Sequence, residues 1–170
     1  HVLVSEDGLD HLPHKAIILC RSALVRRQLR RYRSDFQIYS PAAFATEHDS
    51  TDSTAVDDCS DRQLVEWMEP LRQSNSIDGY AIPRGLHKGL RMQTRRRALH
   101  SEPGEGGVHR FLPEPLSGLV LLVSRTAFPT RICHPLSDEE AMTAWEIETK
   151  LLRKLPSEQR NLVGLLVRHR

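Results

Sequence analysis

The sequence is poor in cysteine, in aromatic residues and in long apolar runs, and each shortage excludes a class of protein. Its three cysteines, Cys20, Cys59 and Cys133, show no Cys-x-x-Cys spacing, so we expect no disulfide framework and an intracellular location, cytoplasmic or organellar. The longest apolar run, Leu119–Val123, is far shorter than the roughly 18 residues of a membrane-spanning helix. Aromatic residues make up only 5% of the chain, which disfavours a surface that stacks on unpaired bases.

Sequence motifs of catalysis and of cofactor binding are also missing. The chain contains no Gly-x-Ser-x-Gly, no Gly-x-Gly-x-x-Gly and no Walker-type loop. Two histidine-containing pairs, His11 with His14 and Cys133 with His134, stand far apart in the chain, and two isolated pairs do not make a zinc-ribbon pattern. We therefore expect no metal site, no cofactor and no catalytic residue, and we favour a protein that is not an enzyme.

The length and the apolar content are those of one ordinary domain with a tail. The chain has 170 residues, of which 44 are Leu, Ile, Val or Phe, and this fraction is sufficient for a packed core. It begins at His1 rather than at Met. We expect a processed mature form or a trimmed piece, in which a removed targeting segment would not be visible.

The net charge of +2 hides blocks of opposite sign. The charges sum to +6 over residues 11–40, to −7 over 41–70 and to +6 over 71–133. Arginine supplies 20 of the 24 cations, and its guanidinium group suits contacts with carboxylates and phosphates. The balance excludes a uniformly basic protein but leaves local basic surfaces available.

The fold class predicted from the pattern is α/β, with a small mixed or parallel sheet and flanking helices. Residues 16–20 and 36–39 have the composition of short strands, and the amphipathic stretch 23–33 between them indicates a helix after a Ser22 cap. This order favours a parallel βαβ unit. Residues 118–124 predict a third strand, central in the sheet.

Two stretches of polar or Pro/Gly-rich composition predict long inserted loops. They cover residues 41–60, which hold four Asp and no Lys or Arg, and residues 101–117. We expect helices after residue 61, ended or kinked by Pro70, and over 84–99. The predicted domains are thus an α/β domain over 1–133 and a helical C-terminal extension over 134–170.

The candidate site consists of basic side chains on two predicted helices. These cations are expected to bind a phosphate backbone or an acidic partner, although solvated faces or pairing with the acidic tract 47–61 are alternatives. The predicted contact residues are Arg26, Arg30, Arg33, Arg84, Lys88, Arg91, Arg95, Arg96 and Arg97.

Two segments resemble parts of known families. Residues 16–32, Ala-Ile-Ile-Leu-Cys-Arg-Ser-Ala-Leu-Val-Arg-Arg-Gln-Leu-Arg-Arg-Tyr, resemble the first strand and helix of response-regulator receiver domains. That family implies a doubly wound sheet and an acidic pair where this chain has Cys20 and Arg21. Residues 152–169 resemble the opening helix of the promoter-reading region of sigma factors, but the chain ends before any helix-turn-helix.

The sequence therefore favours a non-catalytic binding or structural subunit of a larger assembly. The expected partners are other protein subunits and, for a ribonucleoprotein particle, RNA held by the arginine-rich patches. The alternative is a receiver-like regulatory module without phosphotransfer. An enzyme whose site is assembled from scattered residues is a third hypothesis.

Overall fold

The computed structural model describes residues 1–48, 53–100 and 110–167. It divides into unit 1, His1–Phe111, and unit 2, Leu112–Arg170. The boundary expected at residue 133 thus differs from the one that the structure shows. The predicted loop 101–117 lies mostly outside the described residues, and its last part, 110–117, is irregular.

Unit 1 is built on a mixed five-stranded sheet of order β3-β2-β4-β1-β5. In this sheet β2 runs parallel to β3 and β4, whereas β1 runs antiparallel to β4 and β5. The predicted α/β class is therefore confirmed. The strands are β1 Val2–Ser5, β2 Ile17–Cys20, β3 Gln37–Tyr39, β4 Gly79–Ile82 and β5 Arg96–Ala98.

The predicted βαβ unit is confirmed as β2, helix α1 (Ala23–Tyr32) and β3. Ser22 caps α1, because its side chain accepts a hydrogen bond from the Val25 amide. The helix buries Leu24, Val25 and Leu29 and exposes most of its arginines, as its amphipathic pattern predicts.

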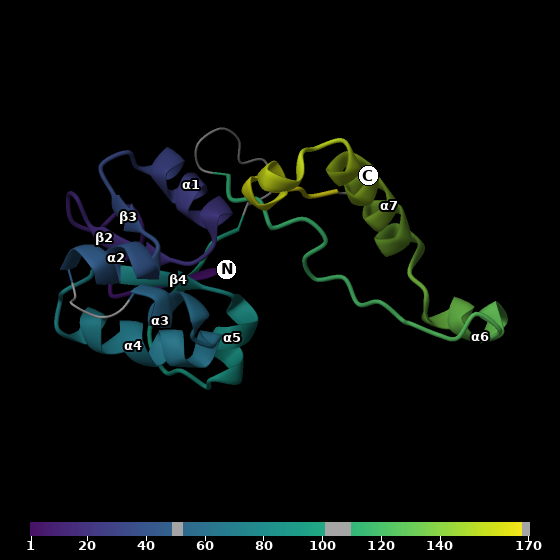
Figure 1. Cartoon of the computed structure of the whole chain (residues 1–170), viewed down its shortest axis with the longest axis horizontal. Helices are drawn as coiled ribbons and strands as arrows, with labels where there is room; N and C mark the ends of the chain where they lie inside the picture. Colours follow the sequence, from purple (N-terminus) through teal and green to yellow (C-terminus); the bar gives the residue numbers. More distant parts are fainter. Residues whose placement is uncertain (49–52, 101–109, 168–170) are drawn as a thin grey trace. The chain divides into compact units, whose positions relative to one another are not determined.

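Helices cover both faces of the sheet (Figure 1). From β2 the chain crosses by α1 to β3 on one side, and from β3 it crosses by α2, α3 and α4 to β4 on the other side. Right-handed crossovers in opposite directions place their helices on opposite faces. The remaining helices of unit 1 are α2 Pro41–His48, α3 Ser53–Asp58, α4 Asp61–Gln73 and α5 Arg84–Gly89.

Alternation along the strands divides the core of unit 1 into two layers. Val2 and Val4 of β1 pack with α2, α3, α4 and α5 on one face, whereas Leu3 packs with α1 on the other. Successive strand residues point to opposite faces. Both faces of the sheet are therefore buried, and α1 and α5 lie on opposite sides of it.

The prediction of a central strand at 118–124 was wrong. Residues 119–125 belong to no strand, and Val120 and Val123 are 89% and 94% exposed. The physical reason is strand pairing. The inner positions of the sheet are taken by β4 and β1, which pair with each other and were not predicted from the sequence. The receiver-like alternative implies a doubly wound sheet, and the observed sheet differs from it because β1 runs antiparallel to β4 and β5.

Three other expectations in unit 1 were wrong. Residues 41–60 are not a loop, since α2 and α3 lie there, with 49–52 outside the described residues. Pro70 does not end α4, which continues to Gln73. The helix expected over 84–99 ends at Gly89, and β5 follows, because pairing with β1 extends the chain there.

Unit 2 is helical in its C-terminal part, as predicted. Its longest helix, α7 (Glu139–Arg153), starts at an N-cap formed by Asp138, whose carboxylate accepts from the Ala141 amide at 3.0 Å. Before α7 come α6 (Thr130–Cys133) and the 3-10 turn η2 (His134–Leu136), and after it comes η3 (Ser157–Leu162). Among the described residues, no helix is long and apolar enough to cross a membrane.

Candidate functional site

The carboxyl ends of β2 and β4 are where a sheet of this kind forms a ligand crevice. The crossover from β2 leads to β3 on one side of it, and the crossover from β3 leads to β4 on the other side of β2. Ligands of open α/β sheets bind at such a switch point. Arg21 and Ser22 follow β2, and Pro83 and Arg84 follow β4. A ligand at the switch point would lie next to these four residues.

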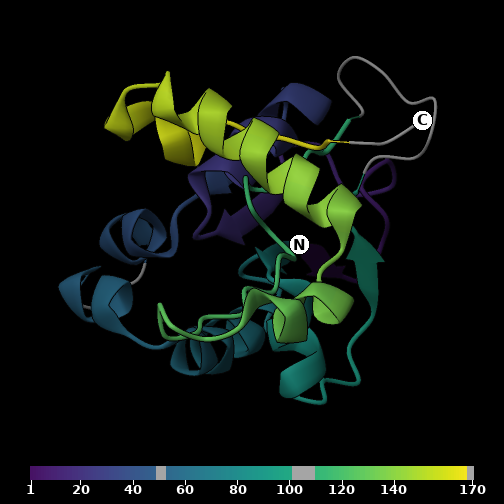
Figure 2. The ribbon, with the colours of Figure 1, turned by 90° about the vertical axis from the view of Figure 1, so that its right-hand side faces the viewer.

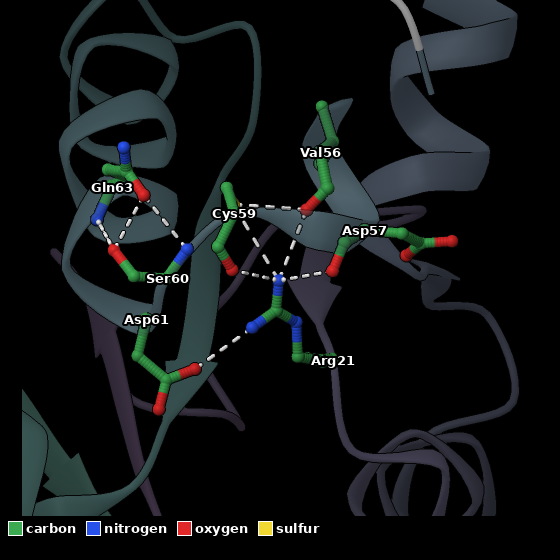
Figure 3. Close-up of polar contacts among 7 residues, drawn as sticks. All are labelled: Arg21, Val56, Asp57, Cys59, Ser60, Asp61 and Gln63. Carbon is green, nitrogen blue, oxygen red and sulfur yellow. Dashed lines mark hydrogen bonds and ion pairs between the residues drawn. The ribbon is translucent and has the colours of Figure 1, made fainter. Parts of the chain in front are cut away.

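Arg21 is engaged by the protein itself (Figure 3). Its Nη1 atom lies 3.0 Å from a carboxylate oxygen of Asp61. Its Nη2 atom donates, at 3.0–3.2 Å, to the carbonyl oxygens of Val56, Asp57 and Cys59. Carbonyls at the end of a helix lack intrahelical partners, and a guanidinium group satisfies several at once.

The Arg21 contacts join the end of α3 to the start of α4. Ser60 caps α4 in a reciprocal capping box, in which its hydroxyl accepts from the Gln63 amide and the Gln63 side chain accepts from the Ser60 amide. Arg21 is thus held between two helix ends. Its role in this structure is to fix the α3–α4 junction.

The predicted cations on α1 also bind groups within unit 1. Arg26 donates to the carbonyl oxygens of Cys20 and Arg21 at 2.8 and 2.7 Å. Arg30 donates to the Ile38 carbonyl at 2.6 Å. The Gln37 amide donates to the Ala16 carbonyl, just before β2, so the backbone of the next residue, Ile38, points away from β2. Arg30 therefore covers the outer edge of β3.

Arg33 is held in the same way at the end of α1. It donates to both carboxylate oxygens of Asp35 and to the carbonyls of Leu9 and Leu12. The hydrogen bond from Arg33 lowers the pKa of Asp35 to about 2, against an opposing effect of burial. Arg26, Arg30 and Arg33 therefore secure the βαβ unit.

The cations of β5 are divided between the two faces of the sheet. Arg96 pairs with Val4 and points toward α5, where it donates to Nδ1 of His87 at 2.9 Å. Arg97 pairs with Leu3 and so lies on the α1 face. Arg95 donates to the carbonyl oxygen of Glu6 at 3.0 Å.

His87 links α5 to β5 from a buried position. It is 2% exposed, and because Arg96 donates to its Nδ1, its proton lies on Nε2, which is 3.4 Å from the Thr94 hydroxyl. Burial lowers the pKa of His87, and the charge of Arg96 lowers it further. The ring is therefore neutral at neutral pH.

Acidification is expected to destabilise unit 1 through His87. Above a pH of about 6.5 neither the folded nor the unfolded chain protonates this ring, and below it the unfolded chain takes up a proton that the folded chain excludes. The melting temperature should fall between pH 7.5 and 5.5, and His87→Gln should flatten that fall. A matched His11→Gln change at an exposed position should leave the slope unaltered; equal slopes for all three proteins would contradict this role.

Three of the predicted cations gather around α5 with their charged groups in water. Arg84 and Lys88 are four residues apart on the helix, so they share one side of it, and Arg91 follows just after its end. All three are exposed, and none of their side chains has a hydrogen bond or ion pair in the described part of the chain. We call Arg84, Lys88 and Arg91 the α5 surface.

The backbone of the α5 surface is unusual at two places. Arg91 has a φ of 51°, a left-handed conformation that glycine commonly takes just after a helix. Gly85 and Gly89 lie inside the helix, where a Cβ added at either would meet nothing within 4 Å. An alanine would fit at both positions and would favour the helix. Because both residues are glycines, the helix backbone is accessible on the side where they lie.

A polar network at the other end of β4 escaped the sequence analysis. The Tyr80 hydroxyl, fully buried, donates to Glu69 at 2.7 Å, and Arg72 donates to both oxygens of the same carboxylate. Burial raises the pKa of Tyr80, and the hydrogen bond to Glu69 raises it further. The network fastens α4 to β4; only the three-residue spacing of Glu69 and Arg72 hinted at it.

The cysteines and histidines are the remaining residues that the sequence singled out. None of the three cysteines is in a disulfide. In the described residues, no group of three or more His, Cys, Asp or Glu side chains is placed to hold a metal ion. Comparison with known proteins adds nothing to this picture: no family model, no curated protein and no solved structure matches the chain.

Proposed function

We propose that the chain is a non-catalytic binding and structural subunit of a ribonucleoprotein assembly, and that the α5 surface contacts the phosphate backbone of RNA. One observation carries the proposal. Of the nine cations predicted from the sequence, five bind acceptors inside unit 1. The other four have no such acceptor in the described residues: Arg84, Lys88 and Arg91 lie on or just after α5, whereas Arg97 stands apart on the α1 face of the sheet. Cations that the fold does not use are available for a polyanion.

The composition and shape of the α5 surface support this choice of ligand. Arginine binds phosphate through two donors at once, and lysine adds a mobile charge. Gly85 and Gly89, which carry no side chain on an open side of the helix, allow a phosphate group to come near the backbone. Because these are contacts to phosphate and not to bases, we expect binding without strong sequence preference.

Substitution of Arg91 separates binding from folding. Arg91→Gly should keep or raise the free energy of unfolding, by up to about 1 kcal/mol, because glycine takes a left-handed φ without strain. The same change should weaken binding of an oligouridine of about 20 nucleotides roughly fivefold at about 50 mM salt, through the loss of one phosphate contact. Fluorescence anisotropy and urea denaturation measure the two effects.

The conservative change Arg91→Lys serves as the control for this test. It keeps the charge and should retain most of the affinity for the oligouridine. If Arg91→Gly binds the oligouridine as tightly as the unchanged protein, Arg91 does not contact RNA. If both variants lose affinity equally, the bidentate donors of the Arg91 guanidinium group, and not its charge alone, make the contact.

A further inference from the structure

The segment Leu119–Ser124 in unit 2 has the sequence of a strand but takes part in no strand pairing among the described residues. Its side chains Val120, Leu121, Leu122 and Val123 are 89%, 68%, 60% and 94% exposed. Figures 1 and 2 show the segment as an extended trace that leads toward α6. Among the described residues, no backbone hydrogen bond involves residues 120–124.

Unit 2 as a whole lacks the apolar burial of a folded unit. Every buried hydrophobic residue of the described chain belongs to unit 1, and every exposed large hydrophobic residue belongs to unit 2. Single soluble chains rarely expose a contiguous apolar patch of more than a few hundred Å². The apolar side chains of unit 2 are therefore available to a partner.

The surroundings of the segment provide apolar recesses. One side of it borders a cavity of about 440 Å³, whose other wall includes Met142 and Trp145 of α7. Residues 122–125 border a second cavity of about 580 Å³ with Phe128 and Ile132. Apolar side chains of a partner that pairs with the segment would have recesses to enter.

The occupant that these features favour is a second copy of this chain. Between Gly118 and Ser124 there is no charged residue, so antiparallel pairing of the segment with itself sets no like charges opposite each other. The two Arg125 side chains would then lie at opposite ends of the ladder. The same apolar surface on both copies is what a two-fold interface requires.

The exposed apolar area is also large enough for a stable dimer. The exposed fractions of the large hydrophobic residues of unit 2 range from 36% to 94%. Together these residues offer on the order of 1,000 Å² per copy, compared with about 800 Å² per partner in a standard interface. We infer that Val120–Ser124 forms an antiparallel β-ladder with the same segment of a second copy, beside the apolar side of α7.

Sedimentation of the full-length chain tests the dimer. We expect the mass of two copies at micromolar concentration, and the mass of one copy for Val120→Lys/Val123→Lys. These two side chains are almost fully exposed, so the change should not unfold unit 1. The control Ser157→Lys/Asn161→Lys adds the same charge at exposed positions of η3 and should remain dimeric.

Hydrogen exchange tests the strand pairing itself. The amides of residues 120–124 should exchange slowly in the dimer and rapidly in the Val120→Lys/Val123→Lys variant. A chain that sediments as one copy at all concentrations would overturn the inference, whether unit 1 or a different protein covers the segment. A dimer that persists in the variant, or whose segment exchanges rapidly, would overturn it too. None of these residues belongs to the α5 surface, so the RNA proposal stands or falls separately.

Discussion

Replacing Gly79 by alanine is expected to lower the free energy of unfolding by about 3 kcal/mol, a large effect for the addition of one methyl group. Gly79 lies in β4 between two strands, opposite Ser5 of β1 and Ile18 of β2. A Cβ there would approach the Val4 carbonyl oxygen to 2.9 Å and the Ser5 Cβ to 3.0 Å. These atoms belong to a central strand or are attached directly to it, so relief requires the sheet to shift.

The matched control for this prediction is Gly85→Ala. An added Cβ at Gly85 meets nothing within 4 Å, and alanine favours a helix over glycine by about 1 kcal/mol. The two variants, compared by urea denaturation followed by circular dichroism, should therefore change stability in opposite directions. Equal stability of Gly79→Ala and Gly85→Ala would mean that β1 and β4 do not pair in the described register.

Reversing two charges of the α5 surface should cause the largest loss of RNA affinity. For Arg84→Glu/Lys88→Glu we expect oligouridine binding to weaken about 100-fold at about 50 mM salt, because two phosphate contacts become repulsive. Both side chains are exposed and have no partner in the described residues. Their substitution should therefore leave the melting temperature nearly unchanged.

The control for the reversal is Arg27→Glu/Arg62→Glu. These two arginines are also exposed and unpartnered in the part of the chain that the structure describes, but they lie on α1 and α4. The control changes the net charge by the same amount and should weaken binding only a few-fold. If both pairs reduce affinity equally, only net charge attracts RNA and the α5 surface is not a site.

An acidic protein surface is the competing ligand for the α5 surface. Polyglutamate carries a similar density of negative charge but offers carboxylates in place of phosphates. If polyglutamate displaces the oligouridine at equal charge concentration, the surface selects negative charge in general, and the proposal of an RNA partner is wrong. We expect much weaker competition, because RNA releases condensed counterions on binding.

The sequence predicted the part of the fold that depends on local signals. The order from residue 16 to residue 39 was readable because a capped amphipathic helix stands between two β-branched runs. β1 and β4 were missed, and β4 begins with Gly79, a residue that disfavours a strand. Their strand state comes from pairing with each other across about 75 residues of chain, which no local pattern records.

Residues 118–124 show the converse case, in which a strand-like composition does not produce a paired strand. The apolar run has the composition of a strand, and the structure leaves it extended but unpaired. Residues 84–99 were read as one helix because Leu86 and Leu90 have helical spacing, but the turn at Arg91 ends that helix and β5 pairs with β1. A strand or a helix end is decided by partners that a local window does not contain.

The sequence predicted that the candidate site is basic, but not which cations belong to it. Arginine runs identified α1 and the region after residue 84 as basic. Which cations bind groups of the fold depends on carbonyl oxygens such as that of Ile38, which lacks a strand partner because β3 is an edge strand. Arg21 was not predicted as important, and its acceptors lie some 35 to 40 residues further along the chain.

The salt dependence of oligouridine binding tests the proposed function most directly. Three phosphate contacts predict that the logarithm of the association constant falls with the logarithm of salt concentration with a slope of about −2. In Arg84→Glu/Lys88→Glu the slope should shrink to less than half of that value, whereas Arg27→Glu/Arg62→Glu should preserve it. A slope near zero for the unchanged protein, or the same slope for all three proteins, would contradict the assignment of the α5 surface to RNA.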